Sequence, residues 1–401
     1  MQRPAFATPA GTPGLAGSAS APRAVRAASD VQTAGRIVVL DGLRGLMTIF
    51  VVVSHFFGEV AHGVNAFAVG WLAVLMFFVL SGFLVGRLIL EKQHHANFFA
   101  VFYIRRCCRT LPVYLFCVLF VYAMMHAVGR APYMDITAQF PLWSYLTFTQ
   151  NVFMVDANAF GPYWLAPTWT LSVEEQFYLI APALFLFVPK RALVPVLAAG
   201  VVLAIIFRAA IVWGSLMVPM AAQVFLPGCM DPLFCGLIAA VLFKQVDLSR
   251  YDQHLRVLPV VMLGLVIGLR FFERPELPVF EVFSRAFASV GCAAYILSVV
   301  RGSPEGERLK SPILGFFGQT SYAVYLTHLA VLGLMHGLIL GTAPDLVTPA
   351  QWAITLAALP ATVLLGWLVT KLVEEPITAY GRSFAWSKES RAQKLPAPVL
   401  S

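Results

Sequence analysis

Hydrophobic residues occur along most of this chain in long runs, which short polar stretches separate. About ten of these runs approach the roughly 20 helical residues that are needed to cross the hydrocarbon of a membrane. They cover residues 38–57, 69–90, 111–129, 169–188, 192–213, 223–243, 257–272, 280–300, 313–340 and 351–373. The pattern predicts an all-α protein, a polytopic transmembrane helical bundle of about ten spans.

Composition supports this prediction and argues against a soluble protein. Hydrophobic residues make up 59% of the 401 positions and charged residues only 12%, which is more apolar surface than a soluble core of this size can bury. Residues 1–34 are instead rich in Ala, Pro, Gly and Ser, so we expect a disordered tail there rather than a signal peptide. A membrane domain at 35–380 and a C-terminal tail at 381–401 complete the predicted organisation.

The distribution of lysine and arginine predicts how the bundle is oriented. With a cytoplasmic N-terminus, most basic residues fall in cytoplasmic loops, and the opposite loops hold little beyond Arg130 and Arg274. An even number of spans then places both termini in the cytoplasm. The net charge of +8 is explained by this orientation. Because no basic face with interleaved aromatic residues occurs outside the spans, we expect no nucleic-acid partner.

The six cysteines are scattered through the chain, mostly within apolar runs. They lack the paired spacing that is typical of a zinc site. We therefore expect buried thiols and no metal centre.

The first predicted span, within "LDGLRGLMTIFVVVSHF", carries three ionisable residues. Asp41 lies one helical turn before Arg44, so the two can pair and become less costly to bury. Arg44 and His55 are eleven positions apart, which places them on nearly the same helix face, about 16 Å apart along the axis. Thr48 lies between them on that face. The alternative is that Asp41 and Arg44 are interfacial anchors and that His55 caps the far end of the span.

Two other predicted helices also carry carboxylates. "PTWTLSVEEQFYLIAP" contains the adjacent Glu174 and Glu175, of which a capping box between Ser172 and Glu175 would explain only one. "LPGCMDPLFCG" places Asp231 directly before a proline, which predicts an interrupted helix with an embedded carboxylate. Arg208, near the end of the preceding span, is a candidate partner for one of these carboxylates.

The ninth span, within "FGQTSYAVYLTHLAVL", carries Ser321, Tyr325 and His328 at intervals of four and three residues, and so on one helix face. His328 lies near the middle of the membrane, where an ionisable residue is by default a functional candidate. A structural histidine that bonds to Tyr325 or to a neighbouring helix fits the same pattern.

The segment "FYIRRCCRTLPVY" gathers Arg105, Arg106 and Arg109 just before Pro112, on one side of a short helical turn. Guanidinium groups bind phosphates bidentately, which lysines do less well. Lipid headgroup binding, combined with the orientation rule above, is the alternative explanation.

The strings "LDGLRG" with His55, "FFVLSGFL", "RRCCRTLP", "PTWTLSVEEQFYLIAP", "SYAVYLTH" and "VEEPI" occur in this order. Together they resemble acyltransferase family 3 of the membrane O-acyltransferases, across about residues 36–380. The resemblance implies a multi-pass enzyme of the bacterial inner membrane, surrounded by membrane lipid. It also implies an acyl group, acetyl in most members, that passes from cytoplasmic acyl-CoA to a hydroxyl of an extracytoplasmic polysaccharide or glycolipid. Acyl-CoA is then a donor substrate, and no cofactor is permanently bound.

Mapped onto this chain, the resemblance implies catalytic roles for Arg44 and His55. It implies a coenzyme site at Arg105, Arg106 and Arg109, and it assigns the family's fourth-helix glutamate to Glu174 or Glu175.

These positions suggest how the reaction proceeds. A coenzyme held by its phosphates would extend its pantetheine arm between helices toward His55. His55 then acts either as general base for the acceptor hydroxyl or as a carrier that forms an acyl-imidazole. Glu174 or Glu175 would orient the imidazole. A secondary transporter or flippase is the alternative function, because buried ionisable residues and a broken helix also occur in transporters. The sequence does not indicate an oligomeric state.

Overall fold

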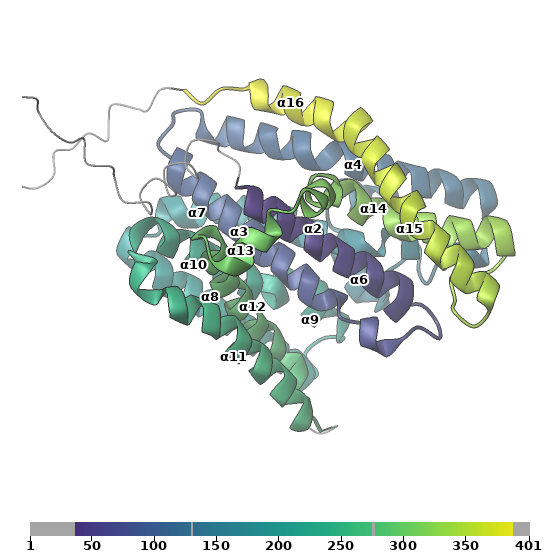
Figure 1. The fold of residues 1–401 in the computed structure, drawn as a ribbon, viewed down its shortest axis with the longest axis horizontal. Helices are drawn as coiled ribbons and strands as arrows, with labels where there is room; N and C mark the ends of the chain where they lie inside the picture. The colour runs from purple at the N-terminus through teal and green to yellow at the C-terminus, as the bar shows by residue number, and fades with distance from the viewer. Residues whose placement is uncertain (1–36, 130, 275–276, 388–401) are drawn as a thin grey trace, which may run out of the picture. The chain divides into compact units, whose positions relative to one another are not determined.

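The computed structural model describes residues 37–129, 131–274 and 277–387. The described helices all belong to one compact unit, Val38–Ser401 (Figure 1). The predicted tail at 1–34 lies outside the described residues, as does Arg130, and the C-terminal tail is described only to residue 387.

Helices account for the described secondary structure, and within these residues no strand forms. The longer α-helices are α2 (Val38–Val53), α3 (Gly70–Lys92), α4 (Phe98–Val128), α7 (Trp169–Phe187), α8 (Lys190–Val212), α10 (Met230–Gln245), α11 (Asp252–Phe271), α12 (Val279–Val300), α14 (Pro312–Leu340) and α15 (Pro349–Val369). The shorter ones are α5 (Leu142–Leu146), α6 (Gln150–Ala157), α9 (Met220–Val224), α13 (Pro304–Leu309) and α16 (Glu375–Ser383). Two π-helical turns, Ser54–Gly58 and Thr370–Glu374, continue α2 and α15.

Nine helical stretches in the described part of the chain are long and apolar enough to cross a membrane. This finding confirms an all-α protein with many spans. The remaining predicted span, at 169–188, forms helix α7, which is not among the nine. Its polar run Glu174, Glu175 and Gln176 makes it less apolar than the others. The placement of both termini in the cytoplasm stays a prediction.

Helix α4 starts earlier than predicted. It runs without interruption from Phe98, so Pro112 lies inside the helix and the nearby arginines lie in its first half, not in a loop before it. The expectation of buried thiols is wrong for Cys107, which is exposed on this part of α4, whereas Cys117 is buried.

Helices α2 and α14 approach each other at backbone distance. A Cβ atom added to Gly45 would lie 2.0 Å from the carbonyl oxygen of Leu314, and one added to Gly318 would lie 1.9 Å from that of Asp41. Neither separation leaves room for a side chain. Gly45 of the "LDGLRG" motif and Gly318 therefore bring the helix of the first predicted span directly against the helix of the ninth.

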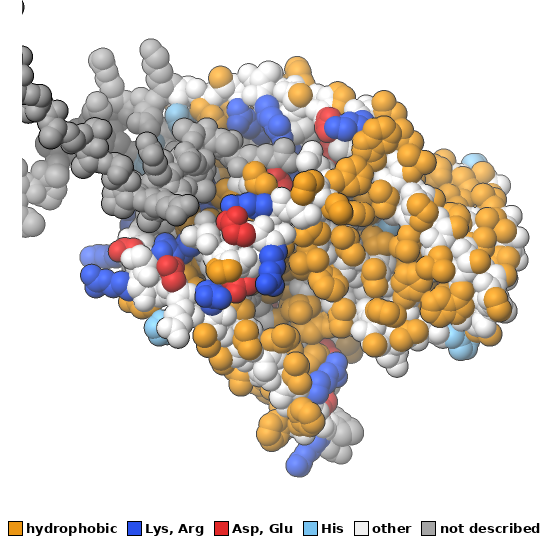
Figure 2. Space-filling view, viewed as in Figure 1, with side chains coloured by type: hydrophobic (Ala, Val, Ile, Leu, Met, Phe, Trp, Pro, Cys, Tyr) orange, Lys and Arg blue, Asp and Glu red, His pale blue; other side chains and the backbone are white. Residues whose placement is uncertain are grey.

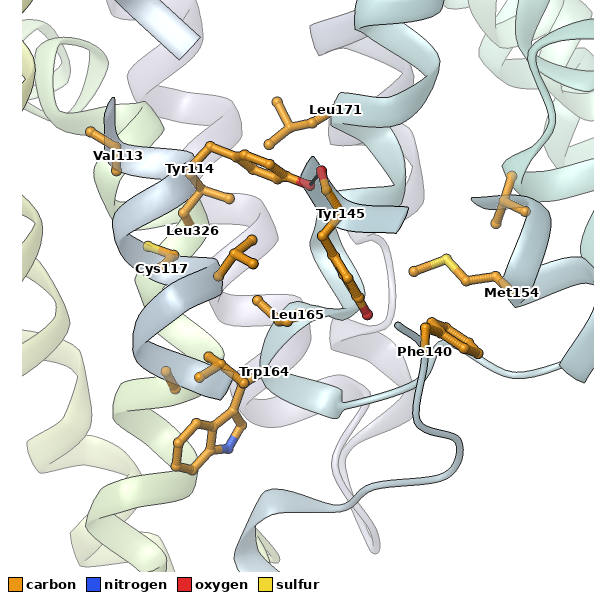
Figure 3. Close-up of a cluster of buried hydrophobic side chains, with 14 of the residues drawn as sticks. Val113, Tyr114, Cys117, Phe140, Tyr145, Met154, Trp164, Leu165, Leu171 and Leu326 are labelled. Atoms are coloured by element: carbon orange, nitrogen blue, oxygen red, sulfur yellow. Dashed lines mark hydrogen bonds between the residues drawn. The ribbon is translucent and has the colours of Figure 1, made fainter. Parts of the chain in front are cut away.

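A buried cluster fixes the segment at 132–168, between α4 and α7, to the rest of the unit (Figure 3). Tyr114 of α4 donates a hydrogen bond of 2.8 Å to the backbone carbonyl of Tyr145 in α5. Leu171 of α7 and Leu326 of α14 belong to the same cluster. Large apolar side chains thus hold this segment of short helices and connecting turns against the longer helices.

The surface agrees with a membrane environment. Hydrophobic side chains cover much of the face shown in Figure 2, whereas charged side chains gather mainly around α13 and the start of α11. The most exposed large hydrophobic side chains include Val260 and Phe271 of α11, which are 69% and 84% exposed. Exposed apolar surface of this kind is typical of a face that contacts a membrane or another protein.

Candidate active site

His55 lies where helix α2 changes into a π-helical turn. The turn spans Ser54–Gly58, and turns of this kind are frequent at functional sites. At the other end of α2, Arg44 forms the predicted contact with Asp41, with Nη1 and Oδ1 3.4 Å apart. Thr48 is buried on α2 between Arg44 and His55, and its hydroxyl donates to the Arg44 carbonyl at 2.9 Å. Thr48 therefore bonds to its own helix.

The first and ninth predicted spans meet at two histidines. Nδ1 of His55 lies 2.7 Å from Nε2 of His328, and the two rings stack with their centroids 4.9 Å apart. Nδ1 of His328 lies 2.7 Å from the backbone carbonyl oxygen of Tyr325. His328 thus bonds to its own helix, as a structural histidine would, and it also contacts His55; a functional role for it stays a prediction.

The carboxylate beside His55 belongs to Glu59, a residue outside the set predicted from the sequence. Its Oε2 atom lies 3.3 Å from Nε2 of His55. Its Oε1 atom accepts a hydrogen bond of 2.7 Å from Ser54, whose oxygen in turn accepts from the Gly70 amide at 2.9 Å. A spacing of four residues between a histidine and a glutamate was the available signal, because such residues are neighbours on a helix.

Glu174 and Glu175 do not orient His55. Glu174 accepts a hydrogen bond of 3.2 Å from Tyr178, and in the described part of the chain neither glutamate bonds to the imidazole. The capping box is also wrong. Helix α7 begins at Trp169, so Ser172 lies inside it, with its hydroxyl buried and unbonded among the described residues. The Oε1 atom of Glu175 is likewise buried without a hydrogen-bond partner there.

A cavity of about 490 Å³, here called the histidine-end cavity, opens beside His55 and Glu59. Elements distant in sequence build it, since it is lined by the 132–168 segment, α3, α12 and the start of α10. Its lining also includes Trp71, Asp135, Asn158, Tyr163, Asp231 and Arg285. Aromatic and hydrogen-bonding side chains together are suited to a polar ring compound.

A second cavity of about 120 Å³, here called the arginine-end cavity, lies at Arg44. Arg106 and Arg109 of α4 line it, together with Glu174 and Ser321. Among the described residues neither Arg106 nor Arg109 forms an ion pair, although Arg106 lies over the ring of Tyr178, 4.7 Å from its centroid. Two guanidinium groups thus remain available to an anionic ligand.

Arg105 does not join this group. Its Nη2 atom donates to the carbonyl of Phe384 at 2.7 Å, and its guanidinium lies over the ring of Trp386, 5.1 Å from the centroid. The three arginines were predicted to share one side of a helical turn. Their positions on α4 do fall within about 100° of arc, but the C-terminal segment packs against the Arg105 side chain and takes it out of the group.

The two cavities share Val74, Phe78 and Tyr325 in their linings. The Tyr325 hydroxyl is fixed by Thr170 at 3.1 Å and by the Pro167 carbonyl at 3.2 Å. The cavity that contains arginines and the cavity that contains His55 therefore adjoin at these three residues.

Arg208 and Asp231 form a bidentate ion pair with both N–O distances at 2.9 Å. Both side chains are fully buried, and Arg208 also donates to the carbonyls of Gly228 and Val282. The predicted partnership is correct. The break in the helix precedes Asp231, which lies in the first turn of α10, and the pair fixes that turn at the wall of the histidine-end cavity.

A family model described as an acyltransferase domain matches residues 37–371. The match covers most of the chain, including both cavities. The chain belongs to this acyltransferase family. The resemblance seen in the motifs is thereby confirmed, and the helices and the family together identify a multi-pass membrane protein.

Two staphylococcal proteins show what this acyltransferase domain is similar to. A protein of Staphylococcus aureus (strain COL), provisionally named an O-acetyltransferase, is 25% identical over 334 residues, which cover 74% of this chain and 51% of that protein. O-acetyltransferase OatA of Staphylococcus aureus (strain NCTC 8325 / PS 47) is 30% identical over 159 residues, or 38% of this chain and 25% of that protein. The chain thus spans about half the length of the first relative. No solved structure matches it.

Proposed function

We propose that this acyltransferase domain transfers an acetyl group from acetyl-CoA to a hydroxyl of an extracytoplasmic polysaccharide or glycolipid. The observation that carries the proposal is the pair of cavities that share Val74, Phe78 and Tyr325. One cavity offers guanidinium groups and the other offers an imidazole, so donor and acceptor approach from opposite ends. The names of the two staphylococcal relatives support acetyl as the group and oxygen as the acceptor.

In this proposal the donor binds at the arginine end, which faces the cytoplasm of a bacterial inner membrane. Arg106 and Arg109 bind the coenzyme phosphates bidentately, and Arg44 adds a third positive charge. The pantetheine arm then extends between Val74 and Tyr325. Asp41 lowers the cost of holding Arg44 inside the bundle.

In this proposal His55 performs the chemistry from the histidine-end cavity, which it lines. As general base it takes the proton of the acceptor hydroxyl at Nε2, and the oxygen attacks the thioester carbonyl carbon. The carbon–sulfur bond breaks, and the coenzyme thiolate leaves and takes up the proton. In the alternative, His55 first carries the acyl group as an acyl-imidazole. The general-base route needs one transfer of the acyl group instead of two.

The acceptor occupies the histidine-end cavity. Trp71 and Tyr163 offer aromatic faces, while Asp135 and Asn158 offer hydrogen-bonding groups. Sugar rings combine an apolar face with hydroxyl groups at the edge, and such a lining matches both.

Membrane vesicles from a strain that expresses the protein, given acetyl-CoA labelled in the acetyl group, test the proposal. Label is expected on cell-envelope glycan, and His55→Ala is expected to abolish it. The matched control is His126→Ala, an exposed histidine at the end of α4 that lines neither cavity. Unlabelled glycan with the wild type, or full transfer by a correctly inserted His55→Ala protein, would contradict the proposal. Passage of an unmodified solute across the vesicle membrane would instead support a transporter.

A further inference from the structure

The hydrogen bonds around His328 determine where its proton lies. A backbone carbonyl oxygen only accepts hydrogen bonds. Because Nδ1 of His328 lies 2.7 Å from the Tyr325 carbonyl oxygen, Nδ1 carries the proton. The side chain is fully buried, and no carboxylate contacts it among the described residues. A neutral ring protonated at Nδ1 presents a lone pair at Nε2.

That lone pair faces His55. Nε2 of His328 lies 2.7 Å from Nδ1 of His55, so Nδ1 of His55 must donate. The remaining nitrogen of His55, Nε2, is then the basic one. It lies 3.3 Å from Oε2 of Glu59, and both residues line the histidine-end cavity. The series of bonds from the Tyr325 carbonyl through His328 thus fixes the tautomer of His55.

We propose that His328 is a positioning residue that holds His55 in the tautomer protonated at Nδ1 and so directs the basic Nε2 atom at the acceptor hydroxyl. The inference rests on the proposed function, because it assigns a role within that reaction. His328 takes the place that a buried carboxylate occupies in serine-protease triads, where loss of the correct tautomer lowers kcat about 10⁴-fold.

Glu59 completes the arrangement on the opposite side of the ring. Ser54 fixes its Oε1 atom, and the Gly70 amide fixes Ser54, so the Oε2 atom is oriented toward Nε2 of His55. When His55 takes the acceptor proton at Nε2, the new positive charge lies beside this carboxylate. The proton then passes from Nε2 to the departing coenzyme sulfur, and the ring returns to its first tautomer.

Two substitutions separate positioning from simple packing. His328→Leu fills the space but offers no acceptor to His55. His328→Gln offers an amide oxygen near the place of Nε2, while its amide nitrogen can donate. The matched control is His336→Leu on the same helix, because His336 is also fully buried, bonds to Thr355 at 2.9 Å and lines neither cavity.

Release of free coenzyme A thiol is measured in membrane vesicles that contain the host's own envelope glycans, across a range of acetyl-CoA concentrations. Rates are normalised to folded protein. His328→Leu is expected to lower kcat about 10³- to 10⁴-fold, by comparison with triad enzymes, with the KM for acetyl-CoA within about threefold of wild type. His328→Gln is expected to recover at least about tenfold of that loss. His336→Leu is expected to keep kcat per folded molecule.

Normal kcat for His328→Leu would overturn the inference, and so would equal kcat values for the Leu and Gln variants or a loss confined to KM. Failure of the proposed function looks different. In that case the wild type itself releases no thiol with acetyl-CoA, or His55→Ala releases it at the normal rate.

Discussion

The Oε2 atom of Glu59 lies 3.3 Å from Nε2 of His55, and both residues line the histidine-end cavity. Burial raises the pKa of the Glu59 carboxyl above its ordinary value, and the hydrogen bond from Ser54 opposes that shift only in part. Glu59 therefore takes up a proton at a higher pH than an ordinary glutamate does. When Glu59 takes up that proton, the negative charge beside His55 is lost.

This pKa shift predicts a pH dependence. As the pH falls through the raised pKa, Glu59 becomes neutral and no longer stabilises a protonated His55, so the rate falls. Glu59→Gln imitates the neutral form at every pH. We expect it to lower the maximal rate about 10- to 100-fold, the value of one hydrogen bond to a charged group, and to remove the part of the pH profile that Glu59 causes. Rates of thiol release measured across pH in wild type and variant test this.

The control is Glu91→Gln, which changes an exposed glutamate that pairs with Arg87 and lines neither cavity. It should leave the profile unchanged. A Glu59→Gln protein with the wild-type rate and profile would show that this carboxylate takes no part.

The sequence was sufficient to predict the membrane fold and several polar positions. Lipid requires spans of a fixed length, so the apolar runs identify the helices directly. Helical spacing also grouped Ser321 with Tyr325, both of which line the arginine-end cavity. The Arg208 and Asp231 pair was predictable because buried charges need partners.

The contacts between helices were not predictable in the same way. His55 and His328 are 273 positions apart, and spacing within one helix does not tell how two helices are rotated against each other. Glu174 and Glu175 were placed beside His55 for this reason. Glu59 follows the end of the apolar run, where a carboxylate suggests only a membrane interface. The contacts of Arg105 with Phe384 and Trp386 were not predictable either, because nothing in its own segment indicates that the C-terminal segment packs against it.

The arginines of α4 give a second prediction. Arg106→Ala and Arg109→Ala should each raise the KM for acetyl-CoA about tenfold or more, with kcat nearly unchanged, because a phosphate contact far from the reacting atoms stabilises ground state and transition state equally. Lysine at either position should recover only part of the affinity. Initial rates across acetyl-CoA concentrations measure both constants.

Arg105→Ala is the matched control on the same helix, because Arg105 bonds to the Phe384 carbonyl and not within the cavity. Its KM should stay within about twofold of wild type, since it makes no phosphate contact to lose. A larger KM effect at Arg105 than at Arg106 and Arg109 would place the phosphates elsewhere.

The residues that line both cavities predict which acyl groups the enzyme transfers. Val74 borders both cavities, so Val74→Ala should widen the connection by about two methyl groups. We expect the rate with propionyl-CoA to rise relative to acetyl-CoA by about 10-fold, the usual effect of one methylene in an apolar pocket. Val79→Ala, at a fully buried position of α3 that lines neither cavity, should leave the ratio unchanged. The same ratio in both variants would mean that the acyl group takes another path.

The ion pair of Arg208 and Asp231 predicts a large and asymmetric effect on stability. Asp231→Ala leaves a fully buried guanidinium without its carboxylate, which should lower the free energy of unfolding by about 3–5 kcal/mol. Replacing both partners, as in Arg208→Met with Asp231→Leu, should restore much of that loss, because no unpaired charge remains. Thermal unfolding of detergent-solubilised protein measures each variant.

The control is Arg256→Ala, which breaks a half-exposed pair with Glu305 at 2.8 Å and should cost about 1 kcal/mol or less. If the double variant were as unstable as Asp231→Ala, the pair would matter for its hydrogen bonds to the Gly228 and Val282 carbonyls rather than for charge balance.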